Sequence, residues 1–150
     1  MLASSSFARP VIAALFLGLS VQASAKSGPE ELSAPTPVDF GDVRKKTDAL
    51  IAEIVAGKAD SALRAALSEN SILAEKTGQI NLMVTQYDSI TTTYGKPEQC
   101  VWLEQSYLSS LRVTTSYVCQ HRDLLIRWVF ETDRLPKGWT YSQITFNSEF

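Results

Sequence analysis

Residues 99–120 read QCVWLEQSYLSSLRVTTSYVCQ, and this stretch decides the fold. It is rich in β-branched and aromatic residues and is interrupted by Ser109-Ser110, a pattern typical of two strands joined by a tight turn. If the chain turns there, opposed residues have numbers that add up to 219, so Cys100 faces Cys119. Directly opposed side chains are close enough for a disulfide. The sequence therefore predicts a β-hairpin closed by a Cys100–Cys119 bond.

The alternation of hydrophobic and polar residues continues beyond this hairpin to the end of the chain. Four strands joined by short turns fit the pattern, and such short connections predict an antiparallel meander. The expected strands are Gln99–Leu108, Leu111–Gln120, Leu124–Asp133 and Trp139–Phe146. In the third of them Ile126, Trp128 and Phe130 share one face, which we expect to pack into the core.

The residues before the sheet have helical periodicity instead. Hydrophobic residues recur at helical spacing over residues 39–56, 59–67 and 71–94. We expect one helix over the first range, a turn or short helix over the second and one helix over the third. Gly95 and Pro97 mark the end of the third helix, because glycine suits a left-handed cap and proline cannot continue a helix. Helices at the N-terminal end must cover an antiparallel sheet from one side. The predicted class is α+β, with N-terminal helices packed on a curved four-stranded meander.

The overall composition indicates a single folded domain. The chain has 150 residues, of which 45% are hydrophobic and 20% are charged, close to the averages of globular proteins. Its formal net charge is −2, so it lacks the broad positive field that binding to nucleic acid or anionic lipid requires. We therefore expect no nucleic-acid partner.

The first 25 residues have the form of a secretory signal peptide. Arg9 precedes an apolar run from Val11 to Val21, and Ala23-Ser24-Ala25 offers the small residues of a cleavage site. The run is shorter than the roughly 20 apolar residues of a transmembrane helix, so an uncleaved anchor is the minor alternative. After cleavage we expect no segment that spans a membrane.

The rest of the chain divides at a proline-rich stretch. We expect residues 26–37 to form a flexible linker and residues 38–150 to form one domain. An exported protein meets an oxidising compartment, where an even pair of cysteines usually forms a disulfide, so the export signal also favours the Cys100–Cys119 bond. The expected location is periplasmic or secreted.

Several local strings, together with the order of the elements, resemble one group of proteins. They are Tyr94-Gly95-Lys96-Pro97 before the first strand, Arg112 and Tyr117 in the second, Leu125-Ile126-Arg127-Trp128-Val129-Phe130 in the third and Gly138-Trp139 opening the last. Residues 39–150 resemble small exported bacterial proteins with a cystatin-like or nuclear-transport-factor-two-like fold. The resemblance implies a cone-shaped α+β fold whose members include dehydratases, isomerases, binding modules and assembly domains, so it selects no function. The sequence departs from the enzymes of this fold by lacking an Asp and His pair for the cavity.

The sequence offers no candidate catalytic residue, cofactor site or metal site. His121 is the only histidine, and its position in an expected turn with Arg122 and Asp123 is typical of a solvated residue. A zinc or copper site needs several converging ligands, and the two cysteines are better explained by a disulfide. A glycine-rich phosphate loop and a nucleophile elbow are both absent from the sequence. These observations favour a protein that is not an enzyme.

Five residues are candidates for ligand binding through the sheet. Trp102, Tyr117 and Trp128 would line a pocket on the concave face for an apolar or aromatic ligand, with the alternative that they fill the core. Arg112 and Arg127 lie on neighbouring strands and would hold an anionic ligand or partner. Their alternative is to face solvent or to pair with a neighbouring glutamate.

We predict from these features an exported binding or interaction domain for a protein, a peptide or a small apolar molecule. Two alternatives stay open. One is a lyase, isomerase or hydrolase of the cone-shaped fold that uses a tyrosine and an aspartate in its cavity, and the other is a domain that self-associates, for example as a homodimer. A buried carboxylate facing a cavity would favour the enzyme, whereas a cavity filled by Trp128 and Phe130 would exclude it.

Overall fold

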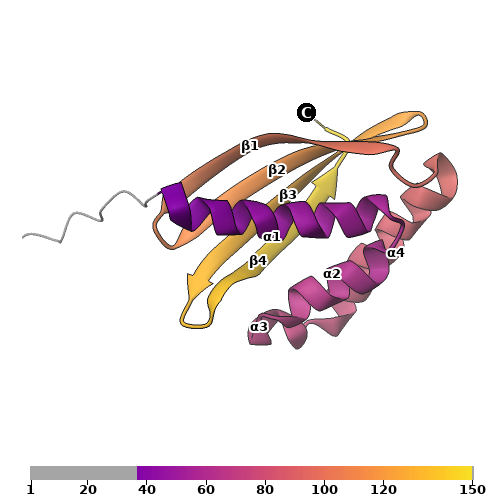
Figure 1. Cartoon of the computed structure of the whole chain (residues 1–150). Helices are drawn as coiled ribbons and strands as arrows, with labels where there is room; N and C mark the ends of the chain where they lie inside the picture. Colours follow the sequence, from indigo (N-terminus) through magenta and orange to yellow (C-terminus); the bar gives the residue numbers. More distant parts are fainter. Residues whose placement is uncertain (1–36, 150) are drawn as a thin grey trace, which may run out of the picture. The chain divides into compact units, whose positions relative to one another are not determined.

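The computed structural model describes residues 37–149 of the chain. The predicted signal peptide and nearly all of the predicted linker lie outside this range. The helices are α1 (Pro37–Val55), α2 (Ala59–Ser68), α3 (Ser71–Ala74) and α4 (Thr77–Tyr94), and the strands are β1 (Gln99–Ser109), β2 (Arg112–His121), β3 (Leu124–Leu135) and β4 (Gly138–Asn147). The strands form one antiparallel sheet in the order β1-β2-β3-β4 (Figure 1). The predicted α+β class and the four-stranded meander are thus confirmed.

Two glycines end the long helices. Gly57 and Gly95 have φ values of +81° and +80°, a region that a residue without a Cβ adopts at low cost. After Gly57 the chain enters α2, and after Gly95 it turns into β1, so both glycines act where a helix has to stop and reverse. The end of the last helix at Tyr94 agrees with the sequence prediction.

The prediction of one helix over residues 71–94 was wrong at its start. The chain leaves helical geometry at Lys76, where ψ is 45°, and this separates the single turn of α3 from α4. Thr77 and Gly78 follow the break, and both have low helix propensity, so little stability is lost by interrupting the helix there. The N-terminus of α3 is capped by Asn70, whose side-chain oxygen accepts a hydrogen bond of 3.0 Å from the backbone N–H of Ile72.

The hairpin of β1 and β2 confirms the disulfide and corrects the turn. Cys100 lies directly opposite Cys119, with Cα atoms 4.0 Å apart, and the two side chains form a disulfide. The strands reverse one residue later than predicted, because Ser109 pairs with Arg112. Two register shifts in β1 bring the pairing back to the predicted alignment at the cysteines, one between Trp102 and Glu104 and one between Tyr107 and Ser109.

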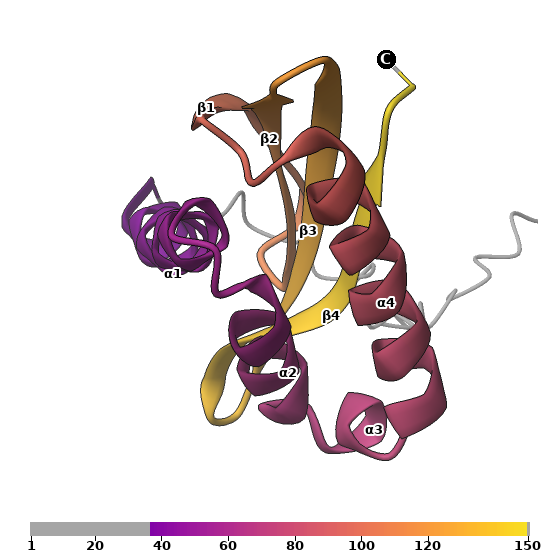
Figure 2. The same cartoon turned by 90° about the vertical axis from the view of Figure 1, so that its right-hand side faces the viewer.

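All of the long helices pack on one face of the sheet. Tyr117 on β2 contacts Thr47 of α1 through its hydroxyl, and Trp128 on β3 packs edge-on against Tyr87 of α4. Tyr117 and Trp128 are directly opposed in the sheet, so they point to the same side. Figure 2 shows the strands curving around this inner side, with α1 and α4 against different parts of it.

The core lies between that inner face and the helices. Trp128 and Phe130 are fully buried and Ile126 is 1% exposed, which confirms the face predicted for the third strand. The other buried hydrophobic residues of this cluster come from three helices and two strands: Leu50, Ile51, Ile54, Leu63, Ala66, Leu67, Ile80, Val84, Tyr87, Tyr117, Cys119, Tyr141 and Ile144. Within residues 37–149, no helix is both long enough and apolar enough to cross a membrane.

Candidate functional site

A row of four aromatic residues crosses the inner face of the sheet from edge to edge. Trp102, Tyr117, Trp128 and Phe146 are successive directly opposed pairs on β1, β2, β3 and β4. The two central residues are buried in the core, whereas Trp102 is 43% exposed and Phe146 is half-buried. The three aromatic residues predicted to bind a ligand therefore lie side by side, but two of them fill the core. Only the two ends of the row reach the surface.

The buried hydroxyl of Tyr117 joins the sheet to α1. It donates a hydrogen bond of 2.6 Å to Oδ1 of Asp48 and lies 2.9 Å from Oγ1 of Thr47. Arg44 in turn donates from Nε to both carboxylate oxygens of Asp48, and its guanidinium lies 4.6 Å from the centre of the Trp102 ring. Burial, together with the hydrogen bond to Asp48, raises the pKa of Tyr117 to about 12. The Tyr117 hydroxyl is therefore protonated and structural at neutral pH.

The two arginines predicted to hold an anion are engaged separately on the outer face of the sheet. Arg112 forms a bidentate ion pair with Asp133, in which Nε lies 2.6 Å from Oδ1 and Nη2 lies 2.8 Å from Oδ2. This pairing lowers the pKa of the Asp133 carboxyl group. Arg127 donates to Oε1 of Glu104 at 2.8 Å. Because Asp133 lies directly opposite Arg112 and six positions from Arg127 on β3, the backbone positions of the two arginines are about 20 Å apart along the sheet. They do not form one anion site.

His121 is buried, and its predicted position in a solvated turn was wrong. It is the last residue of β2 and only 1% exposed, because residues 113, 115, 117, 119 and 121 all point to the inner face. Its Nδ1 donates a hydrogen bond of 2.7 Å to the backbone carbonyl of Gly95, which ties the end of α4 to the sheet. The imidazole also packs edge-on to the ring of Tyr87. This histidine is part of the core.

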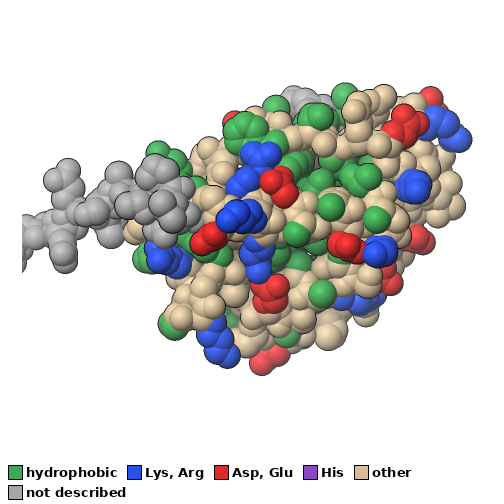
Figure 3. Space-filling model, in the orientation of Figure 1, with side chains coloured by type: hydrophobic (Ala, Val, Ile, Leu, Met, Phe, Trp, Pro, Cys, Tyr) green, Lys and Arg blue, Asp and Glu red, His purple; other side chains and the backbone are tan. Residues whose placement is uncertain are grey.

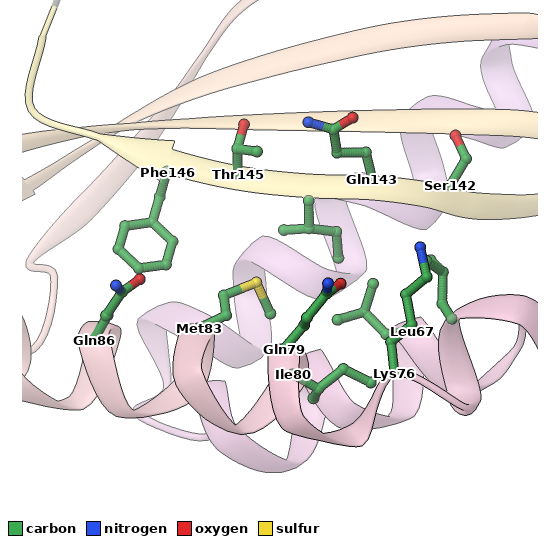
Figure 4. A pocket seen from close by; sticks show the side chains of 12 residues that line it. Leu67, Lys76, Gln79, Ile80, Met83, Gln86, Ser142, Gln143, Thr145 and Phe146 are labelled. Atoms are coloured by element: carbon green, nitrogen blue, oxygen red, sulfur yellow. The ribbon is translucent and has the colours of Figure 1, made fainter.

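A groove of about 460 Å³ lies between α4 and the edge strand β4. Its floor is hydrophobic, and its rim consists of amide and hydroxyl groups with one lysine (Figure 4). The floor residues are Leu67, Leu73, Ile80, Met83, Ile144 and Phe146, and Lys76, Gln79 and Gln86 form the polar rim on α4. On the other side β4 contributes Ser142, Gln143 and Thr145, but the side chains of Gln143 and Thr145 point away from α4 (Figure 4). An apolar floor with a few polar groups is the usual make-up of a binding site, and the volume suits one or two large side chains or a small molecule.

The groove adjoins a free strand edge. β4 is the last strand of the sheet, so every second backbone N–H and C=O points away from β3. Within residues 37–149, no backbone hydrogen bond joins this outer edge to another element. The side chain of Asn70 donates to the carbonyl of Tyr141 at 3.2 Å near one end of the groove. The remaining edge is available for pairing with another extended chain.

A second cavity of about 600 Å³ lies among α1, α2 and α4. Ile54, Leu63 and Val84 form its apolar part, and its rim is charged. The rim includes Asp60 and Arg64, which form an ion pair with each other. This cavity is lined by helices and by the turn after α4 and touches no edge strand, so it offers no backbone pairing to a ligand.

Tyr87, Asp60 and Asp88 line the second cavity, but both carboxylates are exposed, so the buried carboxylate that would favour an enzyme faces neither of the two cavities. The pair of Tyr117 and Asp48 lines neither of them. The space between sheet and helices, where an enzyme of the cone-shaped fold would need its cavity, is occupied by Trp128 and Phe130. In the part of the chain that the structure describes, no three His, Cys, Asp or Glu side chains come together as metal ligands would.

Sequence reasoning did not single out the groove residues. Ile80 and Met83 were assigned to one broad hydrophobic stripe of a helix, and Phe146 to the end of a strand. The hydrophobic stripe on residues 71–94 does carry one signal, in the polar residues at its border. Gln79 and Gln86 border it seven residues apart, two helical turns along the same side of α4, where they form the rim.

Comparison of the chain with protein-family models, with curated protein sequences and with solved structures gave no significant match.

Proposed function

We propose that this protein is a binding domain that holds an extended segment of a partner protein in the groove between α4 and β4. The observation that supports this most is the combination of an apolar groove with a free strand edge along the same side. A bound segment would pair its backbone with β4 and place alternate side chains on the floor formed by Ile80, Met83 and Phe146. The proposal narrows the functions considered from the sequence to recognition of a peptide segment.

The charge around the groove indicates what kind of segment would bind. Lys76 is the only charged residue in its lining, is exposed, and forms no ion pair with a described residue. Opposite charge at this end would strengthen binding by a solvent-screened interaction, and a second cation would weaken it. We therefore expect a segment with a large apolar side chain and a carboxylate a few residues away.

The setting of this function is outside the cytoplasm. The disulfide of Cys100 and Cys119 supports export, because such bonds persist in oxidising compartments. Together with the signal peptide predicted over residues 1–25, it supports a periplasmic or secreted protein. The resemblance to exported proteins of the cystatin-like fold suits this proposal, since that fold also includes binding modules.

Selection from a phage-displayed library of random peptides on the immobilised protein tests the proposal. Peptides of about ten residues are long enough to pair along one strand. The expected result is enrichment of sequences with a large apolar residue near an acidic one. A selected peptide should then protect the backbone amides of β4 from hydrogen exchange. Failure to enrich any peptide, or protection elsewhere, would count against the groove.

Two variants and two matched controls sharpen this test. Gln79→Trp places a bulky side chain on the exposed rim and should abolish binding of the selected peptide, whereas Leu82→Trp alters an exposed residue of the same helix outside the groove. Lys76→Glu should weaken binding of an acidic peptide about tenfold, and the exposed Lys137→Glu on the β3–β4 turn should not. Equal effects of a variant and its control would contradict the proposal.

A further inference from the structure

A second surface of the protein is suited to binding a partner. It lies on β1, at the edge of the sheet opposite the groove. Six of the ten large hydrophobic side chains exposed within residues 37–149 lie on β1 or on the turn that follows it, so the exposed apolar surface is concentrated there. We call this set the β1 surface: Val101, Trp102, Leu103, Tyr107, Leu108 and Leu111, which are between 43% and 83% exposed. Figure 3 shows hydrophobic side chains along β1 and in the band between it and α1.

Two rings of the β1 surface are held in place by α1. Arg44 lies over the Trp102 ring at 4.6 Å, and Phe40 stacks on Tyr107 with ring centres 4.6 Å apart. A ring that is already fixed loses little conformational entropy on binding, and Trp, Tyr and Arg are the residues that contribute most to protein interfaces. This arrangement is therefore suited to contact with another protein surface.

The backbone of β1 restricts what that surface can contact. β1 is the first strand of the sheet, and within the described residues no backbone hydrogen bond joins its outer edge to another element. A long hydrophobic edge with unpaired backbone groups is normally covered, and another strand satisfies those groups most completely. The register shifts at Leu103 and Leu108 interrupt the edge but leave the strand 11 residues long.

Hydrophobic residues flank a polar centre along β1. Three hydrophobic residues, Val101 to Leu103, are followed by the polar residues Glu104 to Ser106 and then by Tyr107 and Leu108. When two such strands pair in antiparallel fashion around a two-fold axis near Gln105, Trp102 faces Leu108 of the second copy. In the same register Leu103 faces Tyr107 of the second copy, so apolar residues meet apolar residues on both sides of the axis.

Charge also favours a second copy. The carboxylate of Glu104, which would lie near the axis in both copies, is neutralised within its own chain by Arg127 at 2.8 Å. Arg44 is likewise paired with Asp48. Two β1 surfaces can therefore approach without the repulsion between like charges that an unpaired residue would cause.

We propose that two copies of this protein associate through β1 in antiparallel fashion, which joins their sheets into one continuous sheet. The proposal is independent of the groove between α4 and β4, because the two surfaces lie on opposite edges of the sheet. Both grooves would stay open in such a dimer, and the assembly would present two binding sites related by the two-fold axis.

Size-exclusion chromatography with light scattering on the chain expressed with its own N-terminal segment tests this proposal. The expected mass is that of two copies at micromolar concentrations. Placing lysines on the edge with Leu103→Lys and Leu108→Lys should raise the dissociation constant of the dimer by at least about tenfold, because a buried lysine at an interface strand opposes pairing. Ile72→Lys is the matched control, because Ile72 on α3 has an exposed fraction of 68%, between those of Leu103 and Leu108, and this change should leave the dimer unchanged.

Hydrogen exchange at two protein concentrations identifies the interface. Protection of the amides of residues 99–109 should increase with concentration, while that of residues 138–147 should not. A monomer at all concentrations overturns the proposal, and so does a monomer in which the β1 amides are already protected, because another part of the chain then covers the edge. A dimer that the lysine variants leave intact overturns it as well. Peptide binding to the groove in the lysine variants shows separately whether the proposed function holds.

Discussion

The hydroxyl of Tyr117 donates a hydrogen bond of 2.6 Å to the carboxylate of Asp48, and this contact attaches α1 to the middle of the sheet. Tyr117 is only 2% exposed, whereas the side chain of Asp48 is about half exposed, so the bond links the core to the surface. Arg44 completes the link by binding Asp48 and lying over Trp102. Tyr117 therefore links α1 to the middle of the sheet, and Arg44 extends this link to the edge strand β1.

The first prediction concerns removal of this hydroxyl. Tyr117→Phe should lower the free energy of unfolding by about 1–2 kcal/mol, because the hydrogen bond is lost and Asp48 keeps only its exposed partner. Chemical denaturation at pH 7 measures this. Tyr107→Phe is the control, since Tyr107 is 56% exposed and should change stability little. Equal stabilities of the two variants would show that the buried bond contributes nothing.

The same tyrosine should make stability depend on alkaline pH. The pKa of Tyr117 is raised to about 12 in the folded protein from an ordinary value of 10.0, so the folded state keeps the proton more strongly than the unfolded state. Its contribution is complete below pH 10 and is lost as the pH rises from 10 to 12. Burial also raises the pKa of Tyr87 and Tyr141. Tyr117→Phe should therefore reduce, but not abolish, the loss of stability across this interval, as measured by denaturation at each pH.

Replacing a tryptophan of the core should destabilise the protein more than replacing one at the surface. Trp128→Ala should lower the free energy of unfolding by about 3–5 kcal/mol, because it empties a fully buried site between Tyr87, Phe130 and Phe146. Trp102→Ala should lower it by about 1 kcal/mol, mainly through loss of the contact with Arg44. Thermal and urea unfolding measure both changes. A mild effect of Trp128→Ala would mean that its side chain is not part of the core.

Loss of the disulfide should destabilise the protein without changing its fold. Cys100 and Cys119 are 19 residues apart, and a closed loop of this length adds about 3 kcal/mol by limiting the unfolded chain. The double replacement by serine should lose this amount, and a reducing agent should weaken the native protein but leave the serine variant unaffected. Mass spectrometry of the unreduced protein provides the direct check, where two free thiols would contradict the bond.

Replacement of the buried histidine should also destabilise the protein. His121→Leu removes the hydrogen bond to the carbonyl of Gly95 and leaves that carbonyl at the end of α4 without this donor. The expected loss is about 1–3 kcal/mol. Gln120→Leu, a change at the neighbouring exposed position, is the control. If both variants unfold at the same urea concentration, His121 behaves as the solvated residue that its place near a turn suggests.

The sequence alone determined the class of fold and the pairing of the cysteines. Alternating residues after Pro97 and helical spacing before it are local patterns, and each follows from which side chains a strand or a helix can turn toward a core. The symmetry of Cys100 and Cys119 about the hairpin was sufficient to predict their bond. The pairing survived an error of one residue in the turn because two register shifts in β1 compensate for it.

Only the tertiary structure decided whether each candidate residue is buried in the core or accessible to a ligand. Whether Trp128 lines a pocket or fills the core depends on how closely α4 approaches the sheet, and no local pattern records that distance. The same holds for His121, which looks exposed in the sequence but is covered by the turn at Gly95.

The groove and the β1 surface likewise belong to the tertiary structure. The groove exists because α4 and β4, some 50 residues apart in sequence, leave a gap over Met83 and Phe146 that neither element fills. β1 is an exposed edge because β2, β3 and β4 all follow on the same side of it in the sheet. This strand order is a property of the tertiary structure. Local sequence dictates which faces are apolar, but the distances between elements determine which of those faces remain open to a partner.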